Sequence, residues 1–231
     1  MLLLKFQKEE YLKPIQQGVF HFSSIETYRD DPTSFRGDEM EGKLFGDPKS
    51  PFLINGIDIS PYLKSVIFSK EYEGRILSIC FSKLDLNNCH EIGEDLYTPN
   101  NDFIEEMTKF GTSFITISSY EFCDCMAKAL ENKKCSYSFH SIIYNDKNDY
   151  EKIRQHYTGK NEDETLFEEF FIKDKQYKMQ NEWRFLIYDP ANEFPLIANG
   201  GVDIQTSFIT EMPIFITKDL HTLRVSKDFL V

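Results

Sequence analysis

The sequence is poor in positive charge. Its 231 residues include 26 Lys and Arg against 38 Asp and Glu, a formal net charge of −12 at pH 7. An acidic protein repels phosphate backbones and anionic membrane surfaces. The charge balance therefore argues against broad nucleic-acid binding, while one small basic pocket stays compatible with it.

Long apolar runs are also lacking. The N-terminal MLLLKF has three consecutive Leu before Lys5, which is shorter than the apolar region of a secretion signal. No stretch approaches the roughly 20 apolar residues that a membrane-spanning helix needs. We expect a cytoplasmic protein that does not contact a membrane.

The sequence has neither a cysteine framework nor a familiar catalytic signature. Its five cysteines are an odd number, and only Cys123 and Cys125 lie close together, which favours reduced thiols over disulfides or a zinc site. No P-loop, G-x-G-x-x-G, H-E-x-x-H or kinase motif is present, and no G-x-S-x-G elbow. These absences exclude phosphate-loop and metalloprotease chemistry and leave serine hydrolysis unsupported. We expect no metal.

Aromatic residues are abundant. The chain holds 21 Phe and 12 Tyr, and 41% of its residues are hydrophobic, which is typical of a folded protein whose strands carry bulky cross-strand pairs. Alternating apolar residues predict strands, and helical spacing predicts helices at 7–17, 101–109 and 118–132. The main strands are expected at 2–6, 19–24, 75–83, 111–118, 135–146 and 178–188.

This pattern predicts the α+β class, with mostly antiparallel sheets of short strands and a few packed helices. No linker or repeat divides the chain, so we expect a single domain over residues 1–231. A stretch rich in Gly and Pro near 43–70 predicts a loop insert in that domain.

The segment KMQNEWRFLIY, residues 178–188, contains the main candidate site. As a strand it would present Gln180, Glu182 and Arg184 on one face and apolar residues on the other. A carboxylate held between an amide and a guanidinium could bind ribose hydroxyls or stabilise a developing cation. An ordinary solvent-exposed face with a Glu–Arg pair explains the same pattern, and the alternation does not choose between them.

Other segments also offer polar groups. In LSICFSK, Ser78 and Ser82 share one strand face, either as hydrogen-bonding groups or as half-buried serines, and Cys80 between them has no evident His partner. His21 in VFHFSS and His140 in CSYSFHSIIY are interpreted as structural histidines.

The segment YRDDPTSFRGDEMEG, residues 28–42, offers charged groups of both signs. Arg29 and Arg36 could hold an anion such as a diphosphate, and three acids could bind a divalent cation, although their spacing fits no loop template. A solvated loop held by its own ion pairs is the alternative. The three acids are Asp38, Glu39 and Glu41.

The ordered fragments resemble a widespread bacterial domain family of unassigned function. They are LLLKF, GVFHFSS, YRDDPTSFRGDEMEG, LSICFS, GTSFITI, HSIIYND and QYKMQNEWRFLI. That family ends its core with a strand that carries two acids and an arginine at alternate positions. Glu182 and Arg184 match this pattern, whereas Gln180 replaces the first acid.

A weaker resemblance is to the ADP-ribosyltransferase superfamily, whose members carry an early basic residue, a central serine strand and a late Gln/Glu-x-Glu element. Lys5, Ser78 or Ser82, and Gln180-Asn181-Glu182 follow this order. Two features depart from it: Lys5 stands where Arg or His is usual, and the serine strand lacks Ser-Thr-Ser.

The resemblance implies an ADP-ribosyltransferase-like fold and an NAD-dependent enzyme, acting as a toxin or phage-defence effector in the bacterial cytoplasm. Glu182 would be the catalytic carboxylate and Gln180 the acceptor-side residue. A small-molecule nucleotide would be the ligand, and a protein target or an antitoxin the partner. Cofactor contacts would come from Lys5, Ser78, Ser82, Arg184 and Arg36, with Lys5 and Arg184 either contacting the phosphates or holding Glu182.

Two other classes of function stay open. The chain could be a non-catalytic module that binds a nucleotide or a protein through its Arg/Asp loop and aromatic strands. The third hypothesis is a metal-dependent hydrolase that uses the carboxylates of Asp38, Glu39 and Glu41.

Overall fold

A computed structural model describes most of the chain. The described residues are 1–31, 38, 42–46, 51, 53–63, 66–69, 72, 75–145, 167–197, 200–207 and 215–230. Arg36, Glu39 and Glu41 lie outside them, so the expected anion and metal contacts of the 28–42 loop fall largely outside the described residues.

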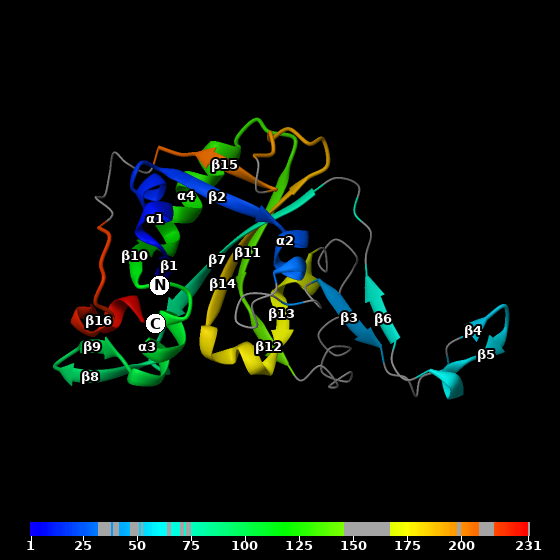
Figure 1. Ribbon diagram of the computed structural model, residues 1–231, viewed down its shortest axis with the longest axis horizontal. Helices are drawn as coiled ribbons and strands as arrows, with labels where there is room; N and C mark the ends of the chain where they lie inside the picture. Colours follow the sequence, from blue (N-terminus) through cyan, green and yellow to red (C-terminus); the bar gives the residue numbers. More distant parts are fainter. Residues whose placement is uncertain are drawn as a thin grey trace.

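A seven-stranded antiparallel sheet forms the centre of the fold (Figure 1). The strand order is β10-β1-β7-β14-β11, with β2 also paired to β7 and β15 paired to β2. The prediction of a mixed helix and strand fold with antiparallel sheets is therefore confirmed. The strands are β1 (Leu2–Gln7), β2 (Val19–Ser24), β7 (Arg75–Leu84), β10 (Ser113–Ser118), β11 (Ser136–Ser141), β14 (Glu182–Asp189) and β15 (Gly201–Gln205).

The main hydrophobic core lies against one face of this sheet. Leu77, Ile79 and Phe81 of β7 point into it, as their alternation predicts, and so do Trp183, Phe185 and Ile187 of β14. Phe122 packs edge-on against Phe81 with ring centroids 4.9 Å apart. Two helices complete this core, α1 (Glu9–Gln16) and α4 (Ser119–Leu130).

A second core packs near β1 and β10. Helix α3 (Asn101–Thr108) contributes Phe103 and Met107, and the Asn100 side chain caps it by accepting the Phe103 N–H at 2.9 Å. A three-stranded sheet and the C-terminal turns complete this region. These are β8 (Cys89–Gly93), β9 (Leu96–Pro99), β16 (Val225–Ser226), η5 (Leu220–Thr222) and η6 (Lys227–Phe229).

The central strand β7 changes partner along one of its edges. It pairs with β14 from Arg75 to Ser82, but on its other edge it meets β2 at residues 77–78 and β1 at residues 82–84. Within the described sheet, residues 79–81 have no strand partner on that edge. The sheet is therefore split between β1 and β2, and the split leaves a stretch of β7 open.

The strand expected at 178–188 begins later than predicted. Residues Lys175–Gln180 form the 3-10 helix η3, and β14 starts at Glu182. Between them Asn181 has φ 42°, a left-handed conformation that Asn tolerates, and its amide donates to the Lys83 carbonyl at 2.7 Å. Gln180 and Glu182 therefore do not share a strand face, and the expected strand is wrong over 178–181.

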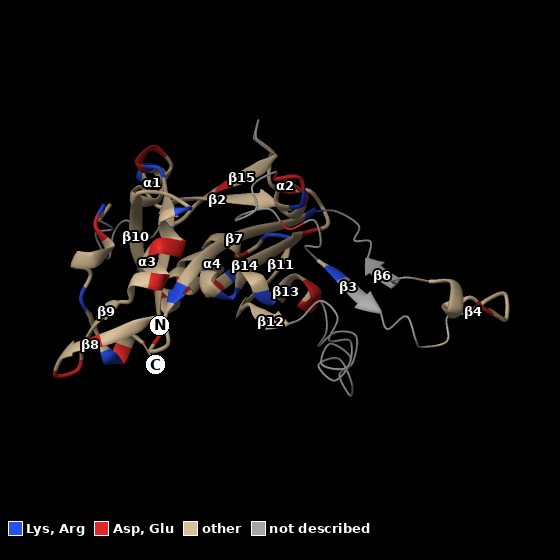
Figure 2. Ribbon diagram, turned by 60° about the horizontal axis from the view of Figure 1, so that its bottom comes forward, with Lys and Arg blue, Asp and Glu red and all other residues tan. Residues whose placement is uncertain are grey.

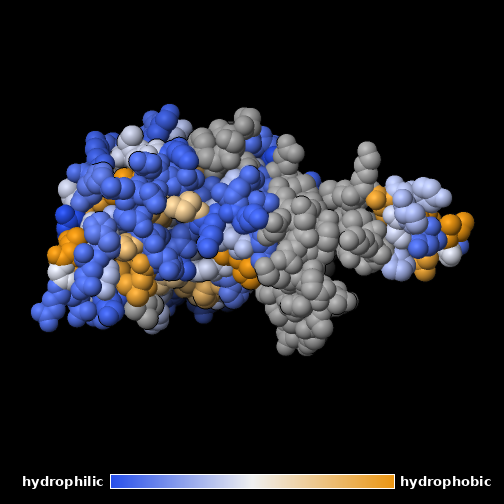
Figure 3. Space-filling view, turned by 90° about the horizontal axis from the view of Figure 1, so that it is seen from below, coloured by the Kyte–Doolittle hydropathy of each residue, from blue (hydrophilic) through white to orange (hydrophobic). Residues whose placement is uncertain are grey.

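Short elements complete the described chain. In the predicted insert near 43–70, β3 pairs with β6 and β4 with β5, and the β4–β5 hairpin exposes Leu53, Ile54 and Ile57 (Figure 3). The pair β12–β13 is parallel. The bounds are α2 (Ile25–Asp30), β3 (Lys43–Gly46), β4 (Leu53–Ile54), β5 (Ile57–Asp58), η1 (Ser60–Tyr62), β6 (Val66–Ser69), β12 (Ile143–Asn145), η2 (Glu168–Phe171) and β13 (Ile172–Asp174).

Charged residues of both signs are interspersed over the described elements (Figure 2). Among the described helices, none combines the length and the apolar character required to cross a membrane.

Candidate functional site

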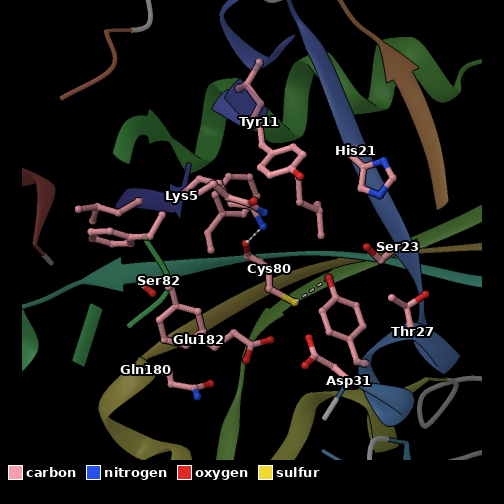
Figure 4. A pocket seen from close by; sticks show the side chains of 18 of the residues that line it. Lys5, Tyr11, His21, Ser23, Thr27, Asp31, Cys80, Ser82, Gln180 and Glu182 are labelled. Atoms are coloured by element: carbon pink, nitrogen blue, oxygen red, sulfur yellow. Dashed lines mark hydrogen bonds between the residues drawn. The ribbon is translucent and has the colours of Figure 1, made fainter. Parts of the chain in front are cut away.

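A cleft of about 560 Å³ opens where β7 is unpaired (Figure 4). Its walls come from β1, β2 and α1, and Cys80 of β7 lies at its centre. This volume falls in the range of small-molecule sites. The split of the sheet creates the cleft, because a paired strand between β1 and β2 would fill it.

Four of the predicted site residues line this cleft: Lys5, Ser82, Gln180 and Glu182. They come from β1, β7, η3 and β14 and are widely separated in the sequence. Gln180 reaches the cleft from η3 rather than from a shared strand face with Glu182.

The geometry corrects the direct cofactor contact expected of Ser78 and favours one of the two roles expected of Arg184, that of holding Glu182. The side chains of Ser78 and Arg184 are fully buried and neither lines the cleft, so neither is placed to contact a ligand directly. Ser78 instead hydrogen bonds the Cys80 sulfur at 3.5 Å, and Arg184 holds Glu182. Arg36 lies outside the described residues.

Glu182 is the centre of a buried ion cluster. Arg184 donates to its Oε1 from Nε at 3.0 Å and from Nη2 at 2.7 Å, and Lys173 Nζ donates to Oε2 at 2.6 Å. The three side chains are 6%, 0% and 5% exposed. The Arg184 Nη1 also donates to the Phe170 carbonyl. The face that could have been solvent-exposed is therefore buried and paired.

This cluster keeps Glu182 ionised. Burial opposes its charge, but the guanidinium of Arg184 and then the ammonium of Lys173 outweigh that effect and hold the pKa of Glu182 well below its ordinary range. The backbone N–H of Glu182 donates to the Tyr144 hydroxyl at 2.7 Å, which fixes the start of β14. A fixed negative charge thus lies on the floor of the cleft.

Lys5 replaces part of the missing strand pairing. Its Nζ donates to the Cys80 carbonyl at 2.8 Å, across the gap between β1 and the open part of β7. A buried carbonyl left without a donor is costly, so this contact stabilises the split sheet. It also brings a cation to the wall of the cleft.

Cys80 is not an activated nucleophile. Burial, and then the charge of Glu182, raise the pKa of its thiol, whereas a reactive cysteine has a lowered pKa. The thiol donates to the Tyr28 hydroxyl at 3.8 Å, and that hydroxyl donates to the Ser78 carbonyl at 3.3 Å. Cys80 therefore acts as a protonated, hydrogen-bonded part of the wall.

The cleft also contains residues that sequence reasoning missed. Lys173 lies in a separate strand, β13, and only the fold brings it to Glu182. His21 was interpreted as structural, yet it lines the cleft and its Nδ1 lies 2.9 Å from the Asp203 carboxylate on β15. In VFHFSS, His21 alternates with the apolar Phe20 and Phe22, which indicates a polar strand face, but no local pattern indicates Asp203 as its partner.

The described residues include no group of His, Cys, Asp and Glu that could hold a metal ion. Comparison with known proteins gives no match, whether to protein-family models, to curated proteins or to solved structures. The chemistry of the site therefore follows from its own residues.

Proposed function

We propose that the cleft binds NAD and that the protein is an ADP-ribosyltransferase-like enzyme. The observation that carries this proposal is the convergence of Lys5, Ser82, Gln180 and Glu182 on one cleft at a split in the sheet. These four are among the seven residues to which the sequence resemblance gives a role, the others being Ser78, Arg184 and Arg36. A role as a toxin or phage-defence effector, with a protein target or an antitoxin as partner, rests on that resemblance alone.

The ionised Glu182 suits this reaction. When the bond between the ribose and nicotinamide breaks, nicotinamide leaves with the electron pair and positive charge develops on the ribose. A carboxylate fixed beside that position stabilises the charge without reorganising. The acceptor then forms the new bond to the ribose and releases a proton.

Three further residues would bind and orient the reactants. Gln180, which lines the cleft, would contact the acceptor, Lys5 would offer a cation for the diphosphate, and Ser82 would offer a hydroxyl at the same wall. The Ser82 hydroxyl currently donates to the Met107 sulfur at 2.9 Å, a weak acceptor that a ligand oxygen would replace favourably.

A specific observation also supports a second function, a non-catalytic nucleotide-binding module. Both oxygens of Glu182 already accept hydrogen bonds from cations. In this second function the carboxylate has a structural role alone, which is to hold Arg184 and Lys173 in place. In that case Glu182 would shape the cleft and no bond of the nucleotide would break.

The test combines NAD binding by calorimetry with nicotinamide release by chromatography. The enzyme should bind NAD and release nicotinamide, and Glu182→Gln should lower the release by roughly 100-fold, the size of effect seen when one charge-stabilising group is removed. Glu91→Gln, on the exposed face of β8, is the matched control and should leave the rate unchanged.

The other outcomes separate the two functions. Binding without nicotinamide release identifies the non-catalytic module. Release that survives Glu182→Gln, or no NAD binding at all, contradicts the proposed enzyme.

A further inference from the structure

The end of the cleft formed by β2 and β15 has its own polar group. His21 and Asp203 lie directly opposite each other in the β2–β15 pairing, and both line the cleft. Ser23, two residues along the same strand, and Thr27 of α2 line the same end (Figure 4). None of these residues has a part in the function proposed above.

Asp203 fixes which nitrogen of His21 carries a proton. A carboxylate only accepts hydrogen bonds, so the Nδ1 that lies 2.9 Å from Asp203 must be the donor. In the neutral ring Nε2 is then an acceptor. The His21 side chain is 43% exposed, so that acceptor can be offered to a ligand.

Gly201 leaves the space that the ring of His21 occupies. A Cβ at Gly201 would lie 2.6 Å from the His21 Nε2 and 2.4 Å from its Cε1. The imidazole therefore lies directly over the Gly201 backbone, and a larger residue there would displace it. The sequence GVDIQ thus supplies both a surface for the ring, at Gly201, and a partner for its Nδ1, at Asp203.

The two ends of the cleft differ in charge. The β2 end is lined by Asp203 together with the neutral hydroxyls of Ser23 and Thr27, whereas the other end holds two ammonium groups, those of Lys5 and Lys173, against the single carboxylate of Glu182. An anionic group would be repelled at the first end and attracted at the second. An uncharged group with hydrogen-bond donors is suited to the β2 end.

We infer that His21, positioned by Asp203, forms a subsite for the uncharged nucleoside half of the ligand. Its Nε2 accepts a hydrogen bond from a ribose hydroxyl or a base amine. This inference rests on the proposed function for the orientation of NAD: with the nicotinamide ribose at Glu182, the β2 end takes the adenosine half. His21 contacts the ligand, and Asp203 is a positioning residue.

In the alternative interpretation, His21 and Asp203 form an exposed ion pair that binds no ligand. Such surface pairs contribute little to stability. The alternative therefore predicts that removing His21 changes neither stability nor nucleoside binding, and this difference can be measured.

The test uses the full chain with ¹⁵N-labelled histidine and adenosine as the probe. Adenosine should shift the His21 Nε2 resonance, and His21→Ala should weaken adenosine binding by about tenfold, the effect of about one lost hydrogen bond. His90→Ala, on the exposed face of β8, is the matched control. Thermal unfolding should show that both variants remain folded.

Two additional arms isolate the roles of His21 and Asp203. Inorganic diphosphate should leave the His21 resonance unchanged, because that end of the cleft is acidic. Asp203→Asn should make the ¹⁵N spectrum of His21 a mixture of the two neutral tautomers and weaken adenosine binding severalfold, which a purely structural role would not do.

The result that overturns the inference is the absence of an adenosine-induced shift at His21, or an unchanged affinity in His21→Ala. A stronger response to diphosphate than to adenosine overturns it as well. If adenosine shifts His21 but NAD does not bind, the proposed function fails and the nucleoside subsite stands.

Discussion

Strand β14 carries a buried carboxylate near each of its ends, Glu182 and Asp189. Their side chains are 6% and 0% exposed, and each is paired with an arginine, Glu182 with Arg184 and Asp189 with Arg75. By burial and by ion pairing with an arginine, the two carboxylates look equivalent. Their remaining partners show that they are not.

Asp189 organises the local chain. It accepts the backbone N–H groups of Glu193 at 2.8 Å and Phe194 at 3.2 Å, which holds the turn after β14, and it does not line the cleft. Glu182 receives a second cation, Lys173, and lies on the cleft floor. The comparison teaches that burial and ion pairing do not by themselves mark a functional carboxylate, whereas the nature and place of its other partners do.

The largest expected effect is on stability. Arg184→Met removes a fully buried guanidinium and should lower the free energy of unfolding by about 3–5 kcal/mol, the range found when a buried ion pair loses one partner. Arg75→Met, at the other end, should cost about 1–3 kcal/mol, because the Arg75 side chain is 17% exposed and Asp189 keeps its backbone donors. Urea unfolding measures both. Equal losses would show that the two ion pairs are energetically alike.

The next effect separates the two carboxylates by function. Asp189→Asn should leave nicotinamide release within about threefold of the original rate, against the roughly 100-fold loss expected for Glu182→Gln. Both changes replace a buried carboxylate by an amide, so each serves as the control for the other. Rates are to be compared at a temperature where both variants are folded. A comparable loss of activity in both would mean that the effect follows from damage to β14 rather than from the cleft.

The pH dependence of stability provides a third comparison. The folded state depresses the pKa of Glu182 below its ordinary 4.5, so its contribution is present above pH 4.5 and is lost as the pH falls from there towards the depressed value. Between pH 5 and pH 3, Glu182→Gln should therefore lose about 1–2 kcal/mol less stability than the original protein. Urea midpoints at pH 7, 5 and 3 measure this difference. Parallel curves would contradict the ionised state of Glu182.

Local sequence patterns predicted the elements of this fold but not the split that creates the cleft. The alternation of LSICFSK puts Leu77, Ile79 and Phe81 on one strand face, and that face lies in the core, because the side-chain period is a local property. The change of partner along β7 depends on where β1 and β2 meet it, and no local pattern encodes that. The antiparallel class was predictable and the open stretch of β7 was not.

The candidate site was predictable only in part. Lys5, Ser82, Gln180 and Glu182 line one cleft, but the strand expected to hold Gln180 is interrupted at Asn181, whose side chain contacts Lys83 and Asp85 far away in the sequence. Alternation alone also cannot distinguish a wet polar face from a buried ion cluster, because both place charged residues at every second position. The buried state of this face depends on groups from separate elements, namely Lys173 Nζ, the Phe170 carbonyl and the Tyr144 hydroxyl.

The smallest expected effect is on the alkylation rate of the Cys80 thiol, which depends on the charge of its neighbour Glu182. Burial and the nearby carboxylate both raise the pKa of the Cys80 thiol. In Glu182→Gln the carboxylate charge is gone while the cations Arg184 and Lys173 remain, so the thiol pKa should fall and alkylation by iodoacetamide at pH 8 should be severalfold faster. Peptide mass spectrometry follows Cys80 directly, with partly buried Cys123 as the internal standard. Asp189→Asn should leave the Cys80 rate unchanged, because Asp189 is not among the charges that shift that thiol. An equal acceleration in both variants would mean that loosening of β14, rather than the charge on the cleft floor, controls access to Cys80.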